Sequence, residues 1–385
     1  MNSACAIRTG RRSCASFDIH FDINVSRNVI LCDLSSRVWV LNLKAIVSES
    51  HGQGKVLLRD VRDPGEPGKT EVRLKMKAVG VCGSDIHVYN GTESYPRKEP
   101  VILGHELMGI VDKTGSEVRN FKTGDRVVCE TAFHVCGRCY NCRKGNYNLC
   151  SSRIGFGALT DGGMAEYLIA REEILHKVPD AVSNVTAALT EPSCVAFNAT
   201  STIGKIEPAD SVLIIGPGPI GLFCLQVATL RSPAAIAMLG VPSDAERLKT
   251  ALEIGANMIF DNARAAVEAL SHSGWGDGVD VVVDASGVSA TLKTALDVIR
   301  PGGRIVKVGW GPDVPGFNLD QIVAKAVELH GSFSHNWETW ERVLRLFTTK
   351  KLNPERIVRQ YSLDRWKDAF EDMEKRRIAK GVLML

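Results

Sequence analysis

Four cysteines between residues 136 and 150 are spaced in a way that suits a metal ion. Two residues separate Cys136 from Cys139 and Cys139 from Cys142, and seven residues lead on to Cys150. Disulfides between cysteines this close would form tight rings, and a ferredoxin-type iron–sulfur run needs its fourth cysteine after three residues, followed by proline. We therefore predict one tetrahedral zinc ion held by four thiolates, a closed structural site without a position for substrate. Cys129 lies outside the spacing and is predicted to be an ordinary strand residue.

A second group of residues could hold a metal ion with an open coordination position. Cys82 lies in "GVCGSDIH", His105 and Glu106 follow in "GHE", and Glu191 lies in "ALTEPSC". A thiolate, an imidazole and one or two carboxylates can bind zinc while leaving a position for water or substrate. A lone cysteine or histidine is more often a core residue, so spacing alone leaves both interpretations open.

The stretch "SVLIIGPGPIGLFCLQVATL" predicts a dinucleotide-binding turn between a strand and a helix. Gly216 permits the tight turn, Gly218 lets the backbone approach a pyrophosphate, and Gly221 lets the helix pack on the strand. Pro219 and Ile220 open the helix, whose free N–H groups and dipole favour the pyrophosphate anion. We therefore predict binding of NAD or NADP at this turn.

The elements that must position these residues divide the chain into segments. Apolar runs recur at helical intervals after the glycines, which predicts strands buried on both faces of a doubly wound parallel sheet. Upstream, short β-rich runs with Gly/Pro turns predict a small barrel-like domain, and an active site in the cleft between the two. The predicted segments are an extension of unknown role (1–43), a β-rich catalytic domain (44–191), a dinucleotide-binding domain (192–330) and a return to the catalytic domain (331–385).

Composition and charge exclude several classes of protein. A length of 385 residues favours two domains, and 44% apolar with 24% charged residues is typical of a soluble globular protein. A formal charge of +3 without a Lys/Arg block favours neither nucleic acid nor a membrane as partner. The longest apolar stretch, 211–230, contains two prolines and three glycines, so we predict no membrane span. Eleven cysteines in a long chain without a visible signal peptide favour a reducing cytoplasm.

From about Lys44 onward, the order of these motifs resembles the zinc-containing medium-chain alcohol and polyol dehydrogenases. The resemblance is to the branch of sorbitol, L-arabinitol and L-threonine dehydrogenases, and it implies a GroES-like catalytic domain beside a Rossmann domain. It implies that four residues hold the catalytic zinc or swing onto it, namely Cys82, His105, Glu106 and Glu191. Asp85 then matches a carboxylate that hydrogen-bonds a ligand histidine, Ser84 the acceptor of the alcohol proton, and His87 the outer member of the proton relay.

The resemblance implies a zinc-dependent hydride transfer between a secondary alcohol and NAD(P). Polyol-specific relatives carry Tyr where Val88 stands and Arg near the position of His335, so both residues count against strict sorbitol or arabinitol activity. We expect a polyol or sugar derivative as substrate, with L-threonine as the alternative. A non-catalytic relative keeping only the structural zinc and a zinc-free quinone-type reductase are further alternatives. The family resemblance also implies a homodimer or homotetramer.

The cofactor preference depends on the end of the second predicted strand, "AMLGVPSDAERL". An NAD-binding turn places Asp or Glu there to hold the ribose hydroxyls, and this chain has Gly240, Val241 and Pro242 instead. Asp244 comes later and is predicted to cap the next helix. Arg247 matches a family arginine near the adenosine ribose, and without the acid a 2′-phosphate could be accepted beside it. Two hypotheses on cofactor preference therefore stay open: a relaxed preference that leans toward NADP, and a preference for NAD.

Overall fold

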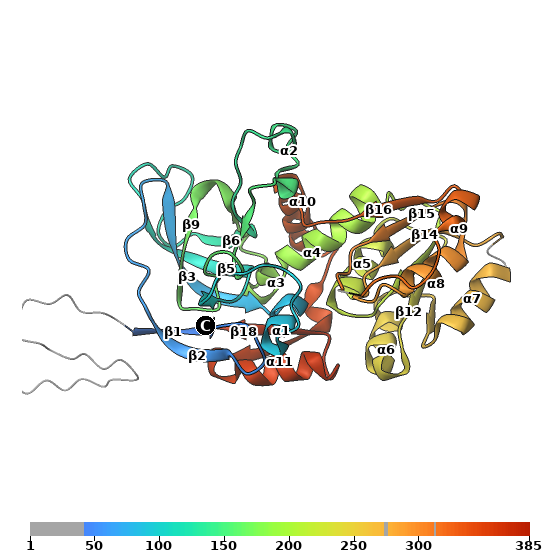
Figure 1. The fold of residues 1–385 in the computed structure, drawn as a ribbon. Helices are drawn as coiled ribbons and strands as arrows, with labels where there is room; N and C mark the ends of the chain where they lie inside the picture. The colour runs from blue at the N-terminus through green and yellow to red at the C-terminus, as the bar shows by residue number, and fades with distance from the viewer. Residues whose placement is uncertain (1–41, 273–275, 312) are drawn as a thin grey trace, which may run out of the picture. The chain divides into compact units, whose positions relative to one another are not determined.

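The computed structural model describes residues 42–272, 276–311 and 313–385 (Figure 1). Residues 1–41 of the predicted extension, with its three cysteines, lie outside these ranges. Asn42 and Leu43, which we assigned to the extension, already belong to the first strand, β1 (Asn42–Ser48). Within the described ranges, no helix combines the length and the apolar character needed to cross a membrane.

The first part of the described chain is built around strand β3, which forms the middle of a largely antiparallel sheet. Apolar residues alternate along β3 and are buried, whereas Lys75 is exposed, which is the pattern of a strand with one core face. The strand order is β10-β6-β5-β3-β18-β17, with β9 also paired to β3, and smaller sheets run β2-β1-β4 and β7-β8. The elements are β1, β2 (Val56–Arg62), β3 (Glu71–Gly80), α1 (Gly83–Asn90), β4 (Val101–Ile102), β5 (Glu106–Thr114), β6 (Arg126–Cys129), β7 (Ala132–His134), α2 (Tyr140–Arg143), η1 (Tyr147–Leu149), β8 (Ile154–Gly155), β9 (Tyr167–Arg171), η2 (Glu172–Ile174), β10 (Leu175–Lys177), α3 (Asn184–Ala188), α4 (Thr190–Phe197) and η3 (Asn198–Ile203).

The second part is the predicted parallel sheet, in the order β13-β12-β11-β14-β15-β16. This order, with the first strand in the middle, is that of a doubly wound dinucleotide-binding fold, so the predicted fold class is confirmed. The elements are β11 (Ser211–Ile215), α5 (Pro219–Thr229), β12 (Ala235–Leu239), η4 (Pro242–Asp244), α6 (Ala245–Ile254), β13 (Met258–Phe260), α7 (Ala263–His272), β14 (Val279–Asp284), α8 (Thr291–Val298), β15 (Ile299–Lys307), α9 (Asp320–Ala324) and β16 (Glu328–Gly331).

Not every strand of the parallel sheet is buried on both faces, and in this the prediction was wrong. Strands β11 and β14 are almost fully buried, but all four residues of β16 are exposed. Strand β16 lies at the edge of the sheet, so in the described chain it has a partner strand, β15, on one side only. Of its residues Glu328, Leu329, His330 and Gly331, only Leu329 has a large apolar side chain, and this composition suits an exposed edge rather than an interior position.

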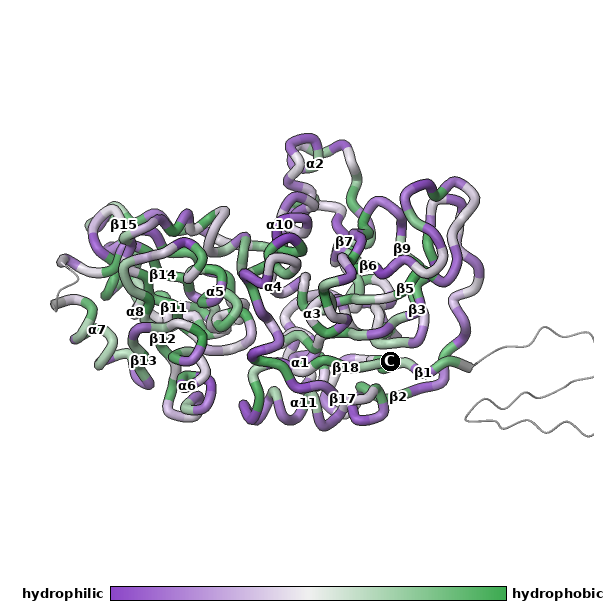
Figure 2. The backbone as a smooth tube through the Cα atoms, turned by 180° about the vertical axis from the view of Figure 1, so that it is seen from behind, coloured by the Kyte–Doolittle hydropathy of each residue, from purple (hydrophilic) through white to green (hydrophobic). Residues whose placement is uncertain are grey.

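After β16 the chain returns to the first sheet. Strand β18 pairs antiparallel with β3 and parallel with β17, so residues from the far end of the sequence lie in the middle of that sheet (Figure 1). One buried apolar cluster contains residues of both sheets together with α4 and α10. Figure 2 shows hydrophobic positions concentrated along the strands, with hydrophilic ones around α2. The elements are α10 (Trp337–Thr348), η5 (Pro354–Ile357), β17 (Val358–Ser362), η6 (Leu363–Arg365), α11 (Trp366–Glu374) and β18 (Lys380–Met384).

Candidate active site and metal centres

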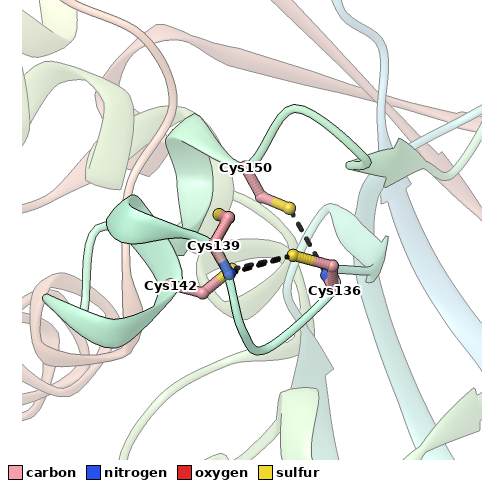
Figure 3. A group of neighbouring side chains, drawn as sticks. All are labelled: Cys136, Cys139, Cys142 and Cys150. Carbon is pink, nitrogen blue, oxygen red and sulfur yellow. Dashed lines mark hydrogen bonds between the residues drawn. The ribbon is translucent and has the colours of Figure 1, made fainter.

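The four spaced cysteines converge on one point in the segment around α2 (Figure 3). Their sulfur atoms all lie within 4.8 Å of one another, and the Sγ atoms of Cys136 and Cys142 are 4.0 Å apart, too far for a disulfide. Backbone N–H groups donate to these sulfurs, from Cys139 to Cys136 and from Cys136 and Ser152 to Cys150. Four convergent thiols that accept backbone hydrogen bonds form a donor set that fits tetrahedral zinc.

The same backbone contacts change the acidity of the thiols. Hydrogen bonds from the N–H groups of Arg138 and Cys139 lower the pKa of Cys136 to about 6. Desolvation and the neighbouring thiols raise the pKa of Cys142 to about 12. A thiolate and a thiol therefore coexist in this cluster when it holds no ion. Cys129 ends β6 and is fully buried in the core, which confirms its prediction as a strand residue.

The second candidate metal group is formed where β3 and β5 meet. Their antiparallel register pairs Gly80 with Glu106, and Cys82, two residues after the end of β3, is the N-cap residue of α1. Ligand atoms of Cys82, His105 and Glu106 lie within 4.8 Å of one another. A Cβ on Gly80 would lie 1.8 Å from Glu106 Oε2, so only glycine leaves space for this carboxylate.

Negative charge accumulates around His105. Burial alone lowers the pKa of the His105 imidazole, but the Cys82 sulfur and the Asp85 and Glu191 carboxylates outweigh burial and raise it to about 10. Asp85 is buried and accepts a hydrogen bond from the backbone N–H of Cys82, while burial raises its own pKa. Several anionic groups around one imidazole give a site whose charge a divalent cation would balance.

The carboxylate of Glu106 is bound on one side only. Lys380 in β18 donates from Nζ to Glu106 Oε1 at 2.5 Å and to the carbonyl oxygen of Val81 at 2.8 Å. Burial raises the pKa of Glu106, and the charge of Lys380 opposes this. Glu106 Oε2 is buried and has no hydrogen-bond partner among the described residues. An unpartnered carboxylate oxygen beside a thiol and an imidazole fits a metal ligand.

Glu191, the fourth predicted ligand, is near this group but outside the 4.8 Å set. It lies in α4, and its Oε1 accepts a hydrogen bond from Thr131 Oγ1 at 3.0 Å and lies 3.0 Å from His335 Nε2. Burial raises the pKa of Glu191, but the hydrogen bonds from His335 and Thr131 and the charge of His105 lower it to about 2. The carboxylate is therefore ionised at neutral pH.

The two predicted relay residues lie on α1. Ser84 is half-buried, and its carbonyl oxygen accepts a hydrogen bond from the Tyr95 hydroxyl at 3.2 Å. His87 is exposed, with Nδ1 3.0 Å from Thr92 Oγ1. The helix thus begins beside the candidate metal group at Cys82 and reaches solvent one turn later.

The glycine turn has the geometry that a dinucleotide requires. Gly216 has a φ of +94°, and a Cβ on Gly221 would lie 1.8 Å from the carbonyl oxygen of Gly216, so a side chain at either position would be strained. A Cβ on Gly218 would meet nothing within 4 Å, so the backbone there is open to a ligand. Pro219 is the first residue of α5, with Ile220 next. These residues fit a pyrophosphate at the start of α5.

Arg247, which we expected near the adenosine ribose, lies in α6 after the end of β12 and has partners in the protein. Its guanidinium donates to the carbonyl oxygens of Met373 and Ile378, at 3.0 and 2.8 Å. Arg376 instead reaches this strand end and donates to Ser243 Oγ at 2.7 Å. The side chain of Asp244 accepts from the N–H of Val241 at 3.2 Å and so closes η4, and does not cap α6 as we predicted.

Sequence reasoning missed Lys380, Thr131 and Arg376 because each meets its partner from a distant segment. Lys380 and Glu106 are 274 residues apart. One signal was present, a lysine within the apolar run "AKGVLML", since a lysine in a buried strand is almost always paired.

A cavity of about 610 Å³ lies between η1, η3 and α10. None of the predicted metal and relay residues lines it, although His335 does.

Two family comparisons match most of the described chain. Residues 68–180 match the alcohol dehydrogenase GroES-like domain, and residues 219–349 match the zinc-binding dehydrogenase domain. The chain is 38% identical over 345 residues to a sorbitol dehydrogenase of Halalkalibacterium halodurans, covering 89% of this chain and 99% of the relative. It is 36% identical to a D-arabitol-phosphate dehydrogenase of Enterococcus avium (86% and 94% covered) and 35% identical to an L-threonine 3-dehydrogenase of Pyrococcus horikoshii (89% and 98% covered).

A solved structure gives the same result. A zinc-binding dehydrogenase from Sinorhizobium meliloti 1021, bound to NADP, superimposes with a TM-score of 0.82 at 30% identity, covering 89% of this chain and 99% of that one. The similarity therefore extends over both sheets and over the segments that carry both candidate metal groups.

Proposed function

This chain belongs to the zinc-containing medium-chain alcohol and polyol dehydrogenases and is an NAD(P)-dependent oxidoreductase, and we propose that its substrate is the secondary alcohol of a polyol or sugar derivative. The observation that carries this proposal is the group Cys82, His105 and Glu106, with ligand atoms within 4.8 Å and Ser84 two residues after Cys82. Glu191 is proposed as a further ligand, and the four spaced cysteines as the holders of the structural zinc.

Bound at this group, zinc supplies Lewis acidity toward the alcohol oxygen, and the dinucleotide accepts the hydride. Ser84 accepts the hydroxyl proton as the substrate is oxidised, and exposed His87 passes it to solvent. Tyr95 supports this step by holding the carbonyl oxygen of Ser84 at the start of α1. Asp85 fixes the N–H of Cys82 and keeps negative charge beside His105.

The two residues that depart from the polyol-specific pattern, Val88 and His335, are both buried. Val88 is 1% exposed and packs in the core beneath α1, and His335 is 4% exposed with ring nitrogens hydrogen-bonded to Glu191 and Trp340. Val88 is therefore enclosed in the core, and His335, although it lines the cavity beside α10, has both ring nitrogens occupied by protein partners. The sorbitol and arabitol-phosphate dehydrogenases among the relatives support the polyol class, and the L-threonine 3-dehydrogenase keeps L-threonine as the second candidate.

The test is an assay of purified protein with polyols, polyol phosphates, sugar acids and L-threonine, each with NAD⁺ and with NADP⁺, together with metal analysis. We expect two zinc ions per chain and the highest kcat/KM with a polyol or its phosphate. A highest kcat/KM with L-threonine would contradict the substrate class. One zinc per chain would contradict the catalytic site and favour a non-catalytic or zinc-free relative.

The end of β12 supports acceptance of the 2′-phosphate of NADP. Ser243 and Arg376 offer a hydroxyl and a partly exposed guanidinium there, and the one nearby acid, Asp244, lies 3.1 Å from Arg376. Two arginines with one carboxylate between them leave a surplus positive charge. We expect Arg376→Ala to lower kcat/KM for NADP about 10- to 100-fold and to change NAD little, with the neighbouring Arg377→Ala as control. A hundredfold advantage of NAD in the unaltered enzyme would contradict this preference.

The remaining organisation is proposed on similar grounds. The division into a catalytic domain (44–191 with 331–385) and a dinucleotide-binding domain (192–330) is supported by the separate sheets and by the return of β18 to β3. Exposed strand β16 supports a homodimer or homotetramer, because an unpaired edge can pair with a second copy. The cysteines in the described ranges are all free, which supports a cytoplasmic location. Light scattering on the purified protein tests the oligomer, and a monomer would contradict it.

A further inference from the structure

The carboxylate of Glu191 is held by side chains from two other segments. Thr131 Oγ1 and His335 Nε2 both lie 3.0 Å from Glu191 Oε1, and all three side chains are buried. A carboxylate oxygen has two lone pairs, so these two hydrogen bonds saturate Oε1. The oxygen left for a further partner is Oε2.

Trp340 determines which nitrogen of His335 carries the hydrogen. The indole Nε1–H of Trp340 donates to His335 Nδ1 at 2.7 Å. An indole nitrogen can only donate, so Nδ1 must accept and the ring hydrogen must be on Nε2. His335 therefore donates to Glu191, and the direction of this bond is set by a residue that does not contact Glu191.

Trp340 is itself fixed from the other side by a second buried histidine. The ring of His176 stacks on Trp340, with centroids 5.3 Å apart and planes 7° from parallel. His176 Nε2 lies 3.1 Å from Glu130 Oε1, and His176 Nδ1 lies 2.7 Å from Glu341 Oε1. Trp340 is fully buried, so its indole has little freedom to turn away from His335.

The chain of contacts ends in the segment that carries the four cysteines. The hydroxyl of Tyr147, between Cys142 and Cys150, donates to both oxygens of Glu130 at 2.9 and 2.7 Å. A continuous series of buried contacts thus runs from Tyr147 through Glu130, His176, Trp340 and His335 to Glu191.

We propose that His335 and Trp340 are positioning residues for the catalytic metal ion, because together they orient Glu191 so that only Oε2 faces the ion. This inference rests on the proposed role of Glu191 as a metal ligand. In this proposal His335 orients a metal ligand, whereas the sequence comparison suggested that it contacts the substrate. Histidines and other groups that orient metal ligands typically affect metal affinity about 10- to 100-fold when removed.

The test compares Trp340→Phe with Trp337→Phe. Trp340→Phe keeps an aromatic ring against His176 but removes the N–H that fixes His335, whereas Trp337 is three residues earlier on the same helix and is exposed. Zinc retained per chain is measured after dialysis against graded chelator concentrations, and the absorption spectrum of the cobalt-substituted catalytic site is recorded. We expect Trp340→Phe to weaken zinc binding at the catalytic site about 10- to 100-fold and shift the cobalt spectrum. The four-cysteine zinc and the Trp337→Phe control should be unchanged.

A second variant keeps the test decisive if Trp340→Phe is poorly folded. His335→Gln retains an N–H donor that can reach Glu191, and His335→Ala does not, so the glutamine should restore most of the zinc affinity that the alanine loses. Wild-type zinc affinity and cobalt spectrum in both Trp340→Phe and His335→Ala would overturn the inference.

Glu191→Gln separates this inference from the proposed function. Wild-type zinc affinity in Glu191→Gln would refute Glu191 as a ligand, and the positioning role would fall with it. Weakened affinity in Glu191→Gln with normal affinity in the His335 and Trp340 variants would leave the ligand in place and refute only the positioning role. Weakened affinity in all of them, with no further loss in the Glu191→Gln, His335→Ala double variant, would support both.

Discussion

The two candidate metal groups are assembled in opposite ways. The four cysteines come from fifteen consecutive residues, lie in a partly exposed segment, and take hydrogen bonds from their own backbone. Cys82, His105, Glu106 and Glu191 come from three separate segments and depend on partners from β18 and from His335, which lies just before α10. The first group is specified locally and the second by the whole fold. Mutations that weaken long-range packing should therefore lower zinc affinity at the catalytic group before they lower it at the four-cysteine group.

The largest expected effect separates chemistry from structure. Cys82→Ser should lower kcat/KM on the order of 10³-fold or more, because a catalytic zinc contributes several kcal/mol to transition-state stabilisation. It should leave the four-cysteine zinc and the melting temperature nearly unchanged. Cys139→Ser should first lower the melting temperature and release the structural zinc, since such sites contribute directly to folding. Equal activity in the two variants, measured with matched zinc content, would contradict the assignment.

The second prediction breaks the buried ion pair that ties β18 to Glu106. Lys380→Met leaves a carboxylate buried without its counter-charge and should lower the free energy of unfolding by about 3–5 kcal/mol. Added zinc should recover part of this loss, because the ion can balance Glu106. Urea unfolding with and without zinc measures both effects. The exposed Lys375–Glu371 pair is the control, and Lys375→Met should cost at most about 1 kcal/mol.

The third prediction concerns the space that Gly80 leaves for Glu106. Gly80→Ala places a methyl group where Glu106 Oε2 lies, so the carboxylate must move and the protein should lose about 1–3 kcal/mol of stability. Catalytic-site zinc affinity should fall with it, while the four-cysteine site keeps its ion. Gly316→Ala adds the same methyl group in open space and should change neither quantity. An unchanged zinc affinity in Gly80→Ala would show that Glu106 is not needed at the ion.

The smallest effect is a pH dependence within the four-cysteine group. Because the pKa of Cys136 is lowered to about 6 and that of Cys142 is raised to about 12, Cys136 is the thiolate of these two near neutral pH in zinc-free protein. Iodoacetamide should then modify Cys136 with a half-maximal rate near pH 6 and leave Cys142 almost unmodified, as peptide mass spectrometry would reveal. Because the pKa of Cys136 is lower in the folded segment, ionised Cys136 stabilises the fold at higher pH. This contribution to the free energy of unfolding is lost as the pH falls through 6. Similar profiles for both cysteines would contradict the assigned hydrogen bonds.

The sequence was informative where the chemistry is local. The cysteine spacing predicted a cluster, the glycines after β11 predicted a turn whose strain and open space the structure contains, and the apolar runs predicted the parallel strands. It was uninformative where side chains meet across the fold. Nothing near Glu191 indicates His335, which lies 144 residues away. The prediction of strands buried on both faces also failed at β16, which forms an exposed edge of the sheet.

Asp244 and Arg247 show the same limit at a finer scale. We expected Asp244 to cap the next helix and Arg247 to lie near the adenosine ribose, but their hydrogen-bond partners were not predictable from the sequence. Asp244 closes the turn before α6, and Arg247 donates to the carbonyl oxygen of Met373 in α11 and to that of Ile378 in the segment that follows it. A helix-capping position and a family arginine can be recognised from sequence, but competition among partners is decided only when distant segments pack.

The position of β18 also fixes an order of events during protein synthesis. Strand β3 is complete after 80 residues, yet its neighbour β18 begins at residue 380, after the whole parallel sheet has been translated. Until then β3 lacks its partner over residues 78–80, and Glu106 lacks the lysine that balances it. The antiparallel sheet can therefore be completed only after the parallel sheet has been translated.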